Sequence, residues 1–86
     1  MSKIDTAEID TIIGQQLRKI RIAKKMSQNE LGQQVGVSFQ QIQKYENGMN
    51  RIPASRLYFL AEALVVSPGV FFEGLRTLDT KDIQLA

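Results

Sequence analysis

The outer face of one short predicted helix carries side chains that suit contact with a nucleic acid. Ile42 and Tyr45 face the inside of this helix, so its other long side chains point outward. The outward residues are Phe39, Gln40, Gln43 and Lys44. Gln and Lys near the start of an exposed helix are side chains that reach base edges and phosphates in the major groove of DNA. The pattern therefore predicts a DNA-reading surface, which neighbouring elements must hold in place.

A helix with clear start and stop signals precedes this surface. Ser27 is a good N-cap, and Glu30 three residues later completes a capping box, in which each side chain bonds the backbone N–H of the other residue. Leu31 and Val35 then repeat at the i, i+4 spacing of a helix. Gly36 follows, where a helix ends in a left-handed conformation that glycine adopts cheaply.

The DNA-reading helix has start and stop signals of its own. Ser38 stands at its N-cap, with Gln41 at the matching capping-box position, and Asn47-Gly48 stops it. The region therefore predicts two short helices joined by a tight turn, with the second helix presenting the polar face.

Composition excludes several classes of function. The 86 residues suffice for one small domain and include neither Cys nor His, which removes disulfides, thiolate metal sites and the commonest general base. There are no clustered carboxylates and no Gly-rich phosphate loop, so we expect no enzyme activity, no cofactor and no metal. No apolar run approaches the ~18 residues of a membrane span, and residues 1–14 lack the pattern of a secretory signal. We expect a cytoplasmic protein that does not bind membranes.

The net charge of +2 is unevenly distributed along the chain. Residues 11–56 carry eight Lys and Arg against two Glu, a net charge of +6, whereas residues 1–10 and 57–86 each carry −2. Positive charge therefore gathers on the segment that holds the two capped helices, as expected of a protein that binds a polyanion. Taken alone, the basic run from Arg18 to Lys25 is more simply the solvated face of a helix.

Helical periodicity without strand-like alternation predicts an all-α domain of five helices. The expected helices cover about residues 11–25, 28–35, 39–47, 53–64 and 68–75. Pro53 suits the opening turn of the fourth helix, and Ser67-Pro68 suits the N-cap and first position of the fifth. We expect an N-terminal arm over residues 1–10, a DNA-binding domain over residues 11–76 and a C-terminal tail over residues 77–86.

Three stretches of the chain share a pattern with a known family. They are IGQQLRKIRIAKKMSQNELG, VGVSFQQIQKYENGMNRIP and LYFLAEALVVSPGVFFEGL. Through them, residues 13–75 resemble the lambda-type helix-turn-helix family, which comprises phage repressor and Cro domains and bacterial relatives often called the XRE family. The resemblance implies a compact, five-helix, lambda repressor-like domain that binds double-stranded DNA through its second and third helices.

The resemblance also implies roles for individual residues. Reading of bases, or contact with adjoining phosphates, is implied for Ser38, Phe39, Gln40, Gln43 and Lys44. Contact with the phosphate backbone is implied for Gln28, Asn47, Asn50 and Arg51. Arg21 and Glu46 match a pair that forms an internal salt bridge in relatives.

Three of these residues have an alternative interpretation. Arg21 could instead be a further charge that faces phosphate. Phe39 stands where relatives often have a polar base reader, so it either presses on a thymine methyl group or folds back to shield Val37. Tyr45 is more simply a core residue with its hydroxyl at the rim than a DNA contact.

The function implied is that of a sequence-specific transcriptional regulator, most simply a repressor, which binds a palindromic operator as a homodimer. The fifth helix is expected to supply the dimer interface, with part of its apolar surface closing the core. The interface residues expected are Val70, Phe71, Phe72 and Leu75. Two alternatives share the fold: an antitoxin, which would also bind a toxin protein, and a controller protein of a restriction–modification system.

Overall fold

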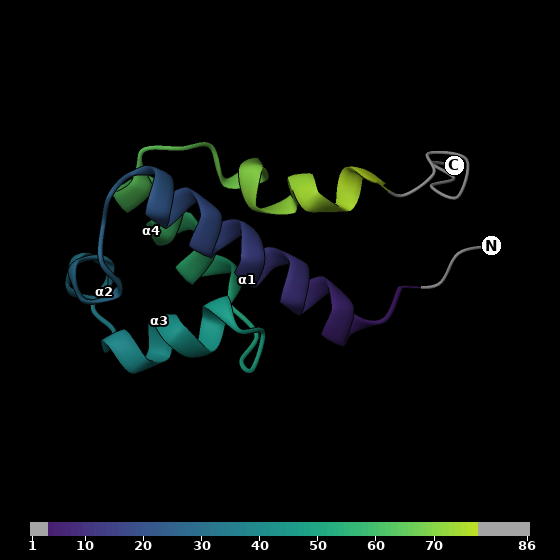
Figure 1. The fold of residues 1–86 in the computed structure, drawn as a ribbon, viewed down its shortest axis with the longest axis horizontal. Coiled ribbons are helices and arrows are strands. Elements are labelled where there is room, and N and C mark those ends of the chain that lie inside the picture. Colours follow the sequence, from purple (N-terminus) through teal and green to yellow (C-terminus); the bar gives the residue numbers. More distant parts are fainter. Residues whose placement is uncertain (1–3, 78–86) are drawn as a thin grey trace.

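The computed structural model describes residues 4–77, which form a layered arrangement of helices without a β-strand (Figure 1). The elements are α1 (Thr6–Ala23), α2 (Gln28–Val35), α3 (Phe39–Glu46), α4 (Ala54–Leu64) and the 3-10 helix η1 (Pro68–Thr77). The all-α, five-helix prediction is confirmed. The tail expected over residues 77–86 lies almost entirely outside the described residues.

The N-terminus of α1 lies before the position predicted from sequence. Asp5 is the N-cap, and its Oδ1 accepts a hydrogen bond from the backbone N–H of Glu8 at 2.8 Å. This cap starts the helix at Thr6, so the predicted start at Thr11 was wrong. Residues 6–10, expected in an arm, are helical because a carboxylate at an N-cap satisfies an N–H that has no partner inside the helix.

The C-terminus of α1 also lies before the predicted position. The helix ends at Ala23 rather than at Lys25, because Lys25 adopts a left-handed φ of 58°. Past this turn, the backbone N–H of Met26 donates to the carbonyl oxygen of Arg21 at 3.1 Å, a bond that closes the end of the helix.

The start and end of α2 agree with the sequence prediction. Ser27 Oγ accepts from the backbone N–H of Glu30 at 3.0 Å, and Glu30 Oε1 accepts from the backbone N–H of Ser27 at 2.9 Å. Hydrogen bonds from the Ser27 backbone, and then from its side chain, lower the pKa of the Glu30 carboxyl group. Gly36 ends the helix with a φ of 78°.

The start of α3 agrees only in part. Ser38 is its N-cap, and Ser38 Oγ accepts from the backbone N–H of Gln41 at 3.1 Å. The Gln41 side chain does not complete the box, because its Nε2 donates instead to Asn50 Oδ1 at 3.4 Å. This longer bond ties α3 to the loop that follows it.

The last two elements differ in detail from the prediction. α4 begins at Ala54, with Pro53 as its N-cap. The fifth helix is present but is a 3-10 helix that extends to Thr77, and its first turn is closed by a bond from the Val70 N–H to the Ser67 carbonyl oxygen at 3.0 Å. The two glycines in this segment favour such an irregular helix, because glycine lowers the stability of a regular α-helix.

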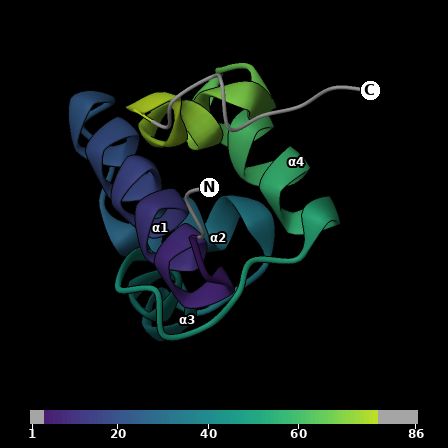
Figure 2. The ribbon, with the colours of Figure 1, turned by 90° about the vertical axis from the view of Figure 1, so that its right-hand side faces the viewer.

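The core lies where α1, α2, α3, α4 and η1 meet. In Figure 2, α1 lies on the left and α4 on the right, with η1 above and α3 below. The buried apolar residues of the core are Ile13, Leu17, Leu31, Ile42, Tyr45, Leu60, Ala61, Leu64 and Phe71. Gly14 permits the close contact of α1 with α3, since a Cβ there would clash with the carbonyl oxygen of Tyr45. This packing fixes the end of α3 against α1.

Within residues 4–77 no single helix is long and apolar enough to cross a membrane. α4 and η1 together reach the required length and composition, but their axes bend by 107° at the junction. Leu60, Leu64 and Phe71 of this pair fill the core of the domain.

Candidate nucleic-acid interface

The outer face of α3, which runs along the lower edge of the fold in Figure 1, is open to solvent. The exposed side chains on it are Phe39, Gln40, Gln43 and Lys44. On the opposite face Ile42 is fully buried, and Tyr45 and Glu46 are nearly so. The fold therefore gathers four of the predicted base-reading residues on one exposed surface and anchors the helix from behind.

The two aromatic residues of α3 take different positions. Phe39 keeps 45% of its surface exposed, while Val37 is partly buried and packs against the core. Tyr45 is only 5% exposed, so it is a core residue, as the simpler interpretation of the sequence held. The exposed Phe39 ring can press on an apolar group such as a thymine methyl.

Ser38, the remaining base-reading candidate, already accepts one hydrogen bond within the protein. Its hydroxyl oxygen accepts the Gln41 N–H as a helix cap, but its O–H remains able to donate. Ser38 is exposed at the N-terminus of α3, where the helix dipole favours an anion. Its position suits a phosphate beside the groove better than a base edge.

Gln28, at the start of α2, belongs to an internal network rather than standing free. Its Nε2 donates to Glu46 Oε1 at 3.0 Å, which leaves the amide oxygen and the backbone N–H for other partners. As the first residue of α2, Gln28 has a backbone N–H without an acceptor inside the helix. An N–H at this position suits a phosphate oxygen.

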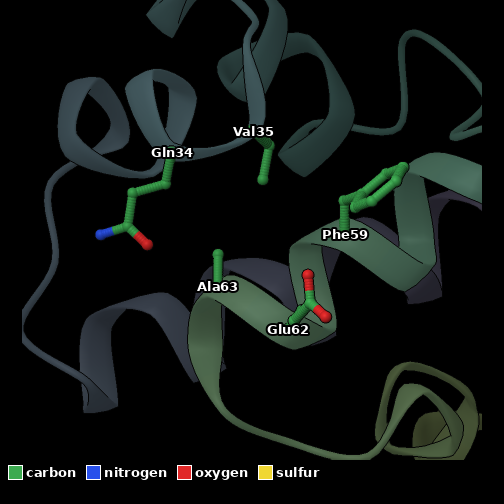
Figure 3. Close-up of a pocket in the computed structure, with 5 residues that line it drawn as sticks. All are labelled: Gln34, Val35, Phe59, Glu62 and Ala63. Atoms are coloured by element: carbon green, nitrogen blue, oxygen red, sulfur yellow. The ribbon is translucent and has the colours of Figure 1, made fainter.

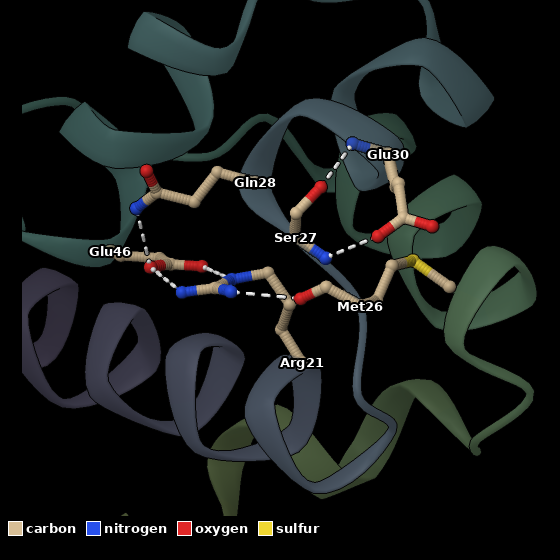
Figure 4. A network of polar contacts seen from close by, with 6 residues as sticks. All are labelled: Arg21, Met26, Ser27, Gln28, Glu30 and Glu46. Carbon is tan, nitrogen blue, oxygen red and sulfur yellow. Dashed lines mark hydrogen bonds and ion pairs between the residues drawn. The ribbon is translucent and has the colours of Figure 1, made fainter.

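The same network contains a buried ion pair between α1 and α3 (Figure 4). Arg21 Nε donates to Glu46 Oε2 at 2.6 Å, and Arg21 Nη2 donates to Glu46 Oε1 at 3.0 Å. A third bond joins Arg21 Nη1 to the carbonyl oxygen of Met26 at 2.9 Å. The internal pair implied by the resemblance is present, so the alternative in which Arg21 faces phosphate was wrong.

The loop between α3 and α4 carries the other three phosphate candidates. Asn47 ends α3 and is exposed. Asn50 accepts the Gln41 side chain through Oδ1, which leaves its NH₂ group as a donor. Arg51 is exposed, and its Nε donates to Asp10 Oδ2 at 3.2 Å.

Sequence reasoning missed Asp10, which it placed in an arm. The residue lies on α1 and pairs with an Arg that is 41 positions away in the chain. The only signal in the sequence was an acidic residue near a helix N-terminus, and that signal names no partner.

A groove lies between α2 and α4, with Gln34, Val35, Phe59, Glu62 and Ala63 facing a shared space of about 420 Å³ (Figure 3). None of the predicted DNA-contacting residues lines it. Within residues 4–77 no cluster of acidic side chains could hold a metal ion there or elsewhere.

The residues expected at the dimer interface do not share one environment. Phe71 is fully buried in the core, so its assignment to an interface was wrong: the ring closes the space between α1 and α4. Val70 and Leu75 are half-buried, and the Val70 carbonyl oxygen accepts the Gln16 side chain at 3.0 Å. Phe72 is 43% exposed and is the residue of this set that faces solvent most.

Comparison with known proteins gives a consistent family. Residues 17–71 match the model of a helix-turn-helix family. The chain is 49% identical over 65 residues to the HTH-type transcriptional regulator y4wC of Sinorhizobium fredii, covering 76% of this chain and 46% of the relative. It is also 49% identical over 73 residues to a transcriptional regulator in the ATPase CF(0) region of Rhodospirillum rubrum, covering 85% of this chain and 68% of the relative.

Solved structures have the same fold. The restriction-modification controller protein C.AhdI from Aeromonas hydrophila superposes with a TM-score of 0.70 at 31% identity, over 72% of this chain and 94% of that protein. The clp gene regulator ClgR from C. glutamicum superposes with a TM-score of 0.76 at 24% identity, over 83% of this chain and 94% of that protein.

The matches cover only part of some relatives but most of the described domain of this chain. The chain spans about half the length of several curated relatives, including y4wC at 46%. The match to the family model nevertheless covers most of the described domain: it includes the whole of α2, α3 and α4, the second part of α1 and the start of η1. The chain belongs to the helix-turn-helix family of DNA-binding transcriptional regulators, of the XRE type.

Proposed function

We propose that the protein is a sequence-specific regulator that binds a palindromic operator in double-stranded DNA as a homodimer and represses transcription there. In this proposal each protomer places α3 in a major groove, in the docking geometry known for phage repressors. The observation that carries the proposal is the exposed outer face of α3, where Gln40, Gln43 and Lys44 stand together on a helix anchored from behind.

The chemistry of this face suits base reading. Glutamine carries two donors and one acceptor, so Gln40 or Gln43 can bond adenine bidentately in the major groove. Lys44 can reach a guanine or a phosphate, and Phe39 can contact a thymine methyl group. Around them, Gln28, Asn47, Asn50 and Arg51 are proposed to bind phosphates, which would set the register of the helix without reading sequence.

The proposed function also requires a dimer. One small module contacts few base pairs, whereas two modules related by a two-fold axis add their contacts and read a palindrome. The half-sites would be separated by about one turn of DNA, roughly 34 Å. Occupation of such a site at a promoter would block transcription, and a protein acting on chromosomal DNA in this way would work in the cytoplasm.

Selection of bound sequences from a random duplex pool tests this function. The expected result is a palindrome whose half-sites are about one helical turn apart. A variant with both Gln40→Ala and Gln43→Ala should lose the enriched sequence, while Gln15→Ala, an exposed glutamine on α1, should retain it. Failure of the wild-type protein to enrich any sequence would contradict the proposal.

A controller protein of a restriction–modification system is a second candidate. The likeness to C.AhdI at 31% identity favours it over the antitoxin alternative, for which the groove between α2 and α4 offers a surface but no identified partner. The two can be separated by purifying the protein from its own host: an antitoxin would carry a tightly bound second protein, whereas a controller would bind DNA without one.

A further inference from the structure

Asp10 is a largely covered carboxylate beside the loop that joins α3 to α4. Its side chain is 16% exposed and lines a cavity of about 200 Å³. Apart from Asp10 and its partner Arg51, the walls of this cavity are apolar: Ile13, Ile52, Ala54, Leu57 and Phe72. A carboxylate in such surroundings needs a charged partner, because apolar walls offer it no hydrogen bonds.

Arg51 supplies that partner with only one edge of its guanidinium group. Its Nε donates to Asp10 Oδ2 at 3.2 Å, while 68% of the side chain is exposed. Arginine carries five N–H donors, and the four on its terminal nitrogens have no hydrogen-bond partner within residues 4–77. The protein therefore holds the guanidinium group at Nε, and the two terminal nitrogens remain free in solvent.

We propose that Asp10 is a positioning residue for DNA binding: it holds the Arg51 guanidinium by its Nε so that the terminal nitrogens grip a phosphate of the DNA backbone. The inference rests on the proposed role of Arg51 as a phosphate contact. Asp10 itself does not touch DNA in this arrangement, because only 16% of its side chain is exposed.

Asp10 could instead compete with DNA for Arg51, and this alternative makes the opposite prediction about the effect of Asp10 on DNA binding. A competing Asp10 would engage the terminal nitrogens and would have to release them before a phosphate could bind. The observed bond uses Nε alone, so a phosphate can bind without breaking it. A free arginine side chain also loses much rotational freedom when it is immobilised at an interface, and a pre-existing bond reduces that loss.

A double-mutant cycle on a palindromic duplex tests this role. Dissociation constants would be measured over a range of salt concentrations for the wild type, Asp10→Ala, Arg51→Ala and the double variant. With Arg51 present, Asp10→Ala should weaken binding about three- to tenfold. With Arg51 replaced, the same change should alter affinity by less than about twofold, because the residue through which Asp10 acts is gone.

Two matched variants separate positioning from charge and from folding. Glu8→Ala removes the same charge from an exposed site on the same helix and should not weaken binding. Asp10→Asn keeps an oxygen that can accept the Nε–H, so it should bind DNA more tightly than Asp10→Ala does. Circular dichroism would establish that each variant is folded at the temperature of the binding measurements.

The outcomes that overturn the inference are distinct from those that overturn the proposed function. Tighter binding by Asp10→Ala, or an equal effect with and without Arg51, would refute positioning while DNA binding stands. An unchanged salt slope in Arg51→Ala, where a loss of roughly one unit is expected, would refute the phosphate contact and the inference with it. Absence of any DNA binding by the wild type would refute the function itself.

Discussion

Arg21 and Glu46 form a two-point ion pair that joins α1 to the last turn of α3, with donor–acceptor distances of 2.6 and 3.0 Å. Their side chains are 11% and 1% exposed, so little water is available to either charge. Gln28 adds a bond to the same carboxylate from α2. The three helices that frame the proposed DNA-reading face therefore meet at one buried charge.

Removal of Arg21 should destabilise the fold strongly. Arg21→Ala leaves the Glu46 carboxylate buried without its counter-charge, which is expected to lower the free energy of unfolding by up to about 3–5 kcal/mol. Thermal and urea unfolding would measure the loss. Arg18→Ala, an exposed arginine on the same helix, is the control and should change stability by no more than about 0.5 kcal/mol. Equal melting of the two variants would show that the pair contributes little.

Replacement of Gln40 should change specificity more than general affinity. If its amide reads one base, Gln40→Ala should cost about 1–3 kcal/mol on the preferred site and relax the preference at a single position. Binding to the operator and to single-base variants of it would be compared with binding to random duplex. A uniform loss on specific and random DNA would instead assign Gln40 to the phosphate backbone.

Replacement of Phe72 should separate assembly from folding. Phe72 is 43% exposed on η1, so Phe72→Glu should leave the core intact and produce a folded monomer. Because Phe72 also lines the cavity of Asp10 and Arg51, the mass of the protein rather than its DNA affinity decides the outcome. Sedimentation gives the mass, and Phe59→Glu on α4 is the control, because Phe59 is 51% exposed but lies outside η1. A dimeric Phe72→Glu protein would move the interface to another surface.

Val65 offers a way to stabilise the domain. This residue ends α4 with a φ of 58° and is 81% exposed, yet β-branched residues are disfavoured in the left-handed region. Val65→Asn should raise the free energy of unfolding by about 1 kcal/mol, since Asn tolerates this conformation. Val65→Ala, which removes the branch but keeps a Cβ, should gain less. A loss of stability in Val65→Asn would mean that Val65 makes a contact of greater value than the strain it carries.

The capping box at Ser27 should make stability depend on pH. Because its bonds to Ser27 lower the pKa of Glu30 in the folded state, the unfolded chain binds more protons in the acidic range. This contribution is present above the ordinary pKa of Glu, at about 4, and is lost as the pH falls through the lowered value. Unfolding measured across that range should show a shallower loss in Glu30→Gln, which cannot titrate. Parallel curves for the two proteins would contradict the assignment.

The sequence by itself determined the local features of this protein. Ser27 with Glu30, Gly36, Ser38 and the stop at Asn47-Gly48 were all readable, because each signal acts on a backbone group within a few residues. The outward face of α3 followed from the same spacing. The early start of α1 was missed because an Asp at position 5 is a cap only when the chain ahead of it turns away from the helix.

The tertiary structure decided which residues meet across the chain. Gln28 with Glu46, Gln41 with Asn50 and Asp10 with Arg51 are separated by 18, 9 and 41 positions, so no local pattern pairs them. The same holds for Phe71 and Phe72: neighbouring apolar residues on a 3-10 helix point in different directions, and only the positions of α1 and α4 make one of them core and leave the other in solvent. Spacing along a helix fixes which side chains share a face, but the packing of the other elements decides whether that face is buried or exposed to solvent.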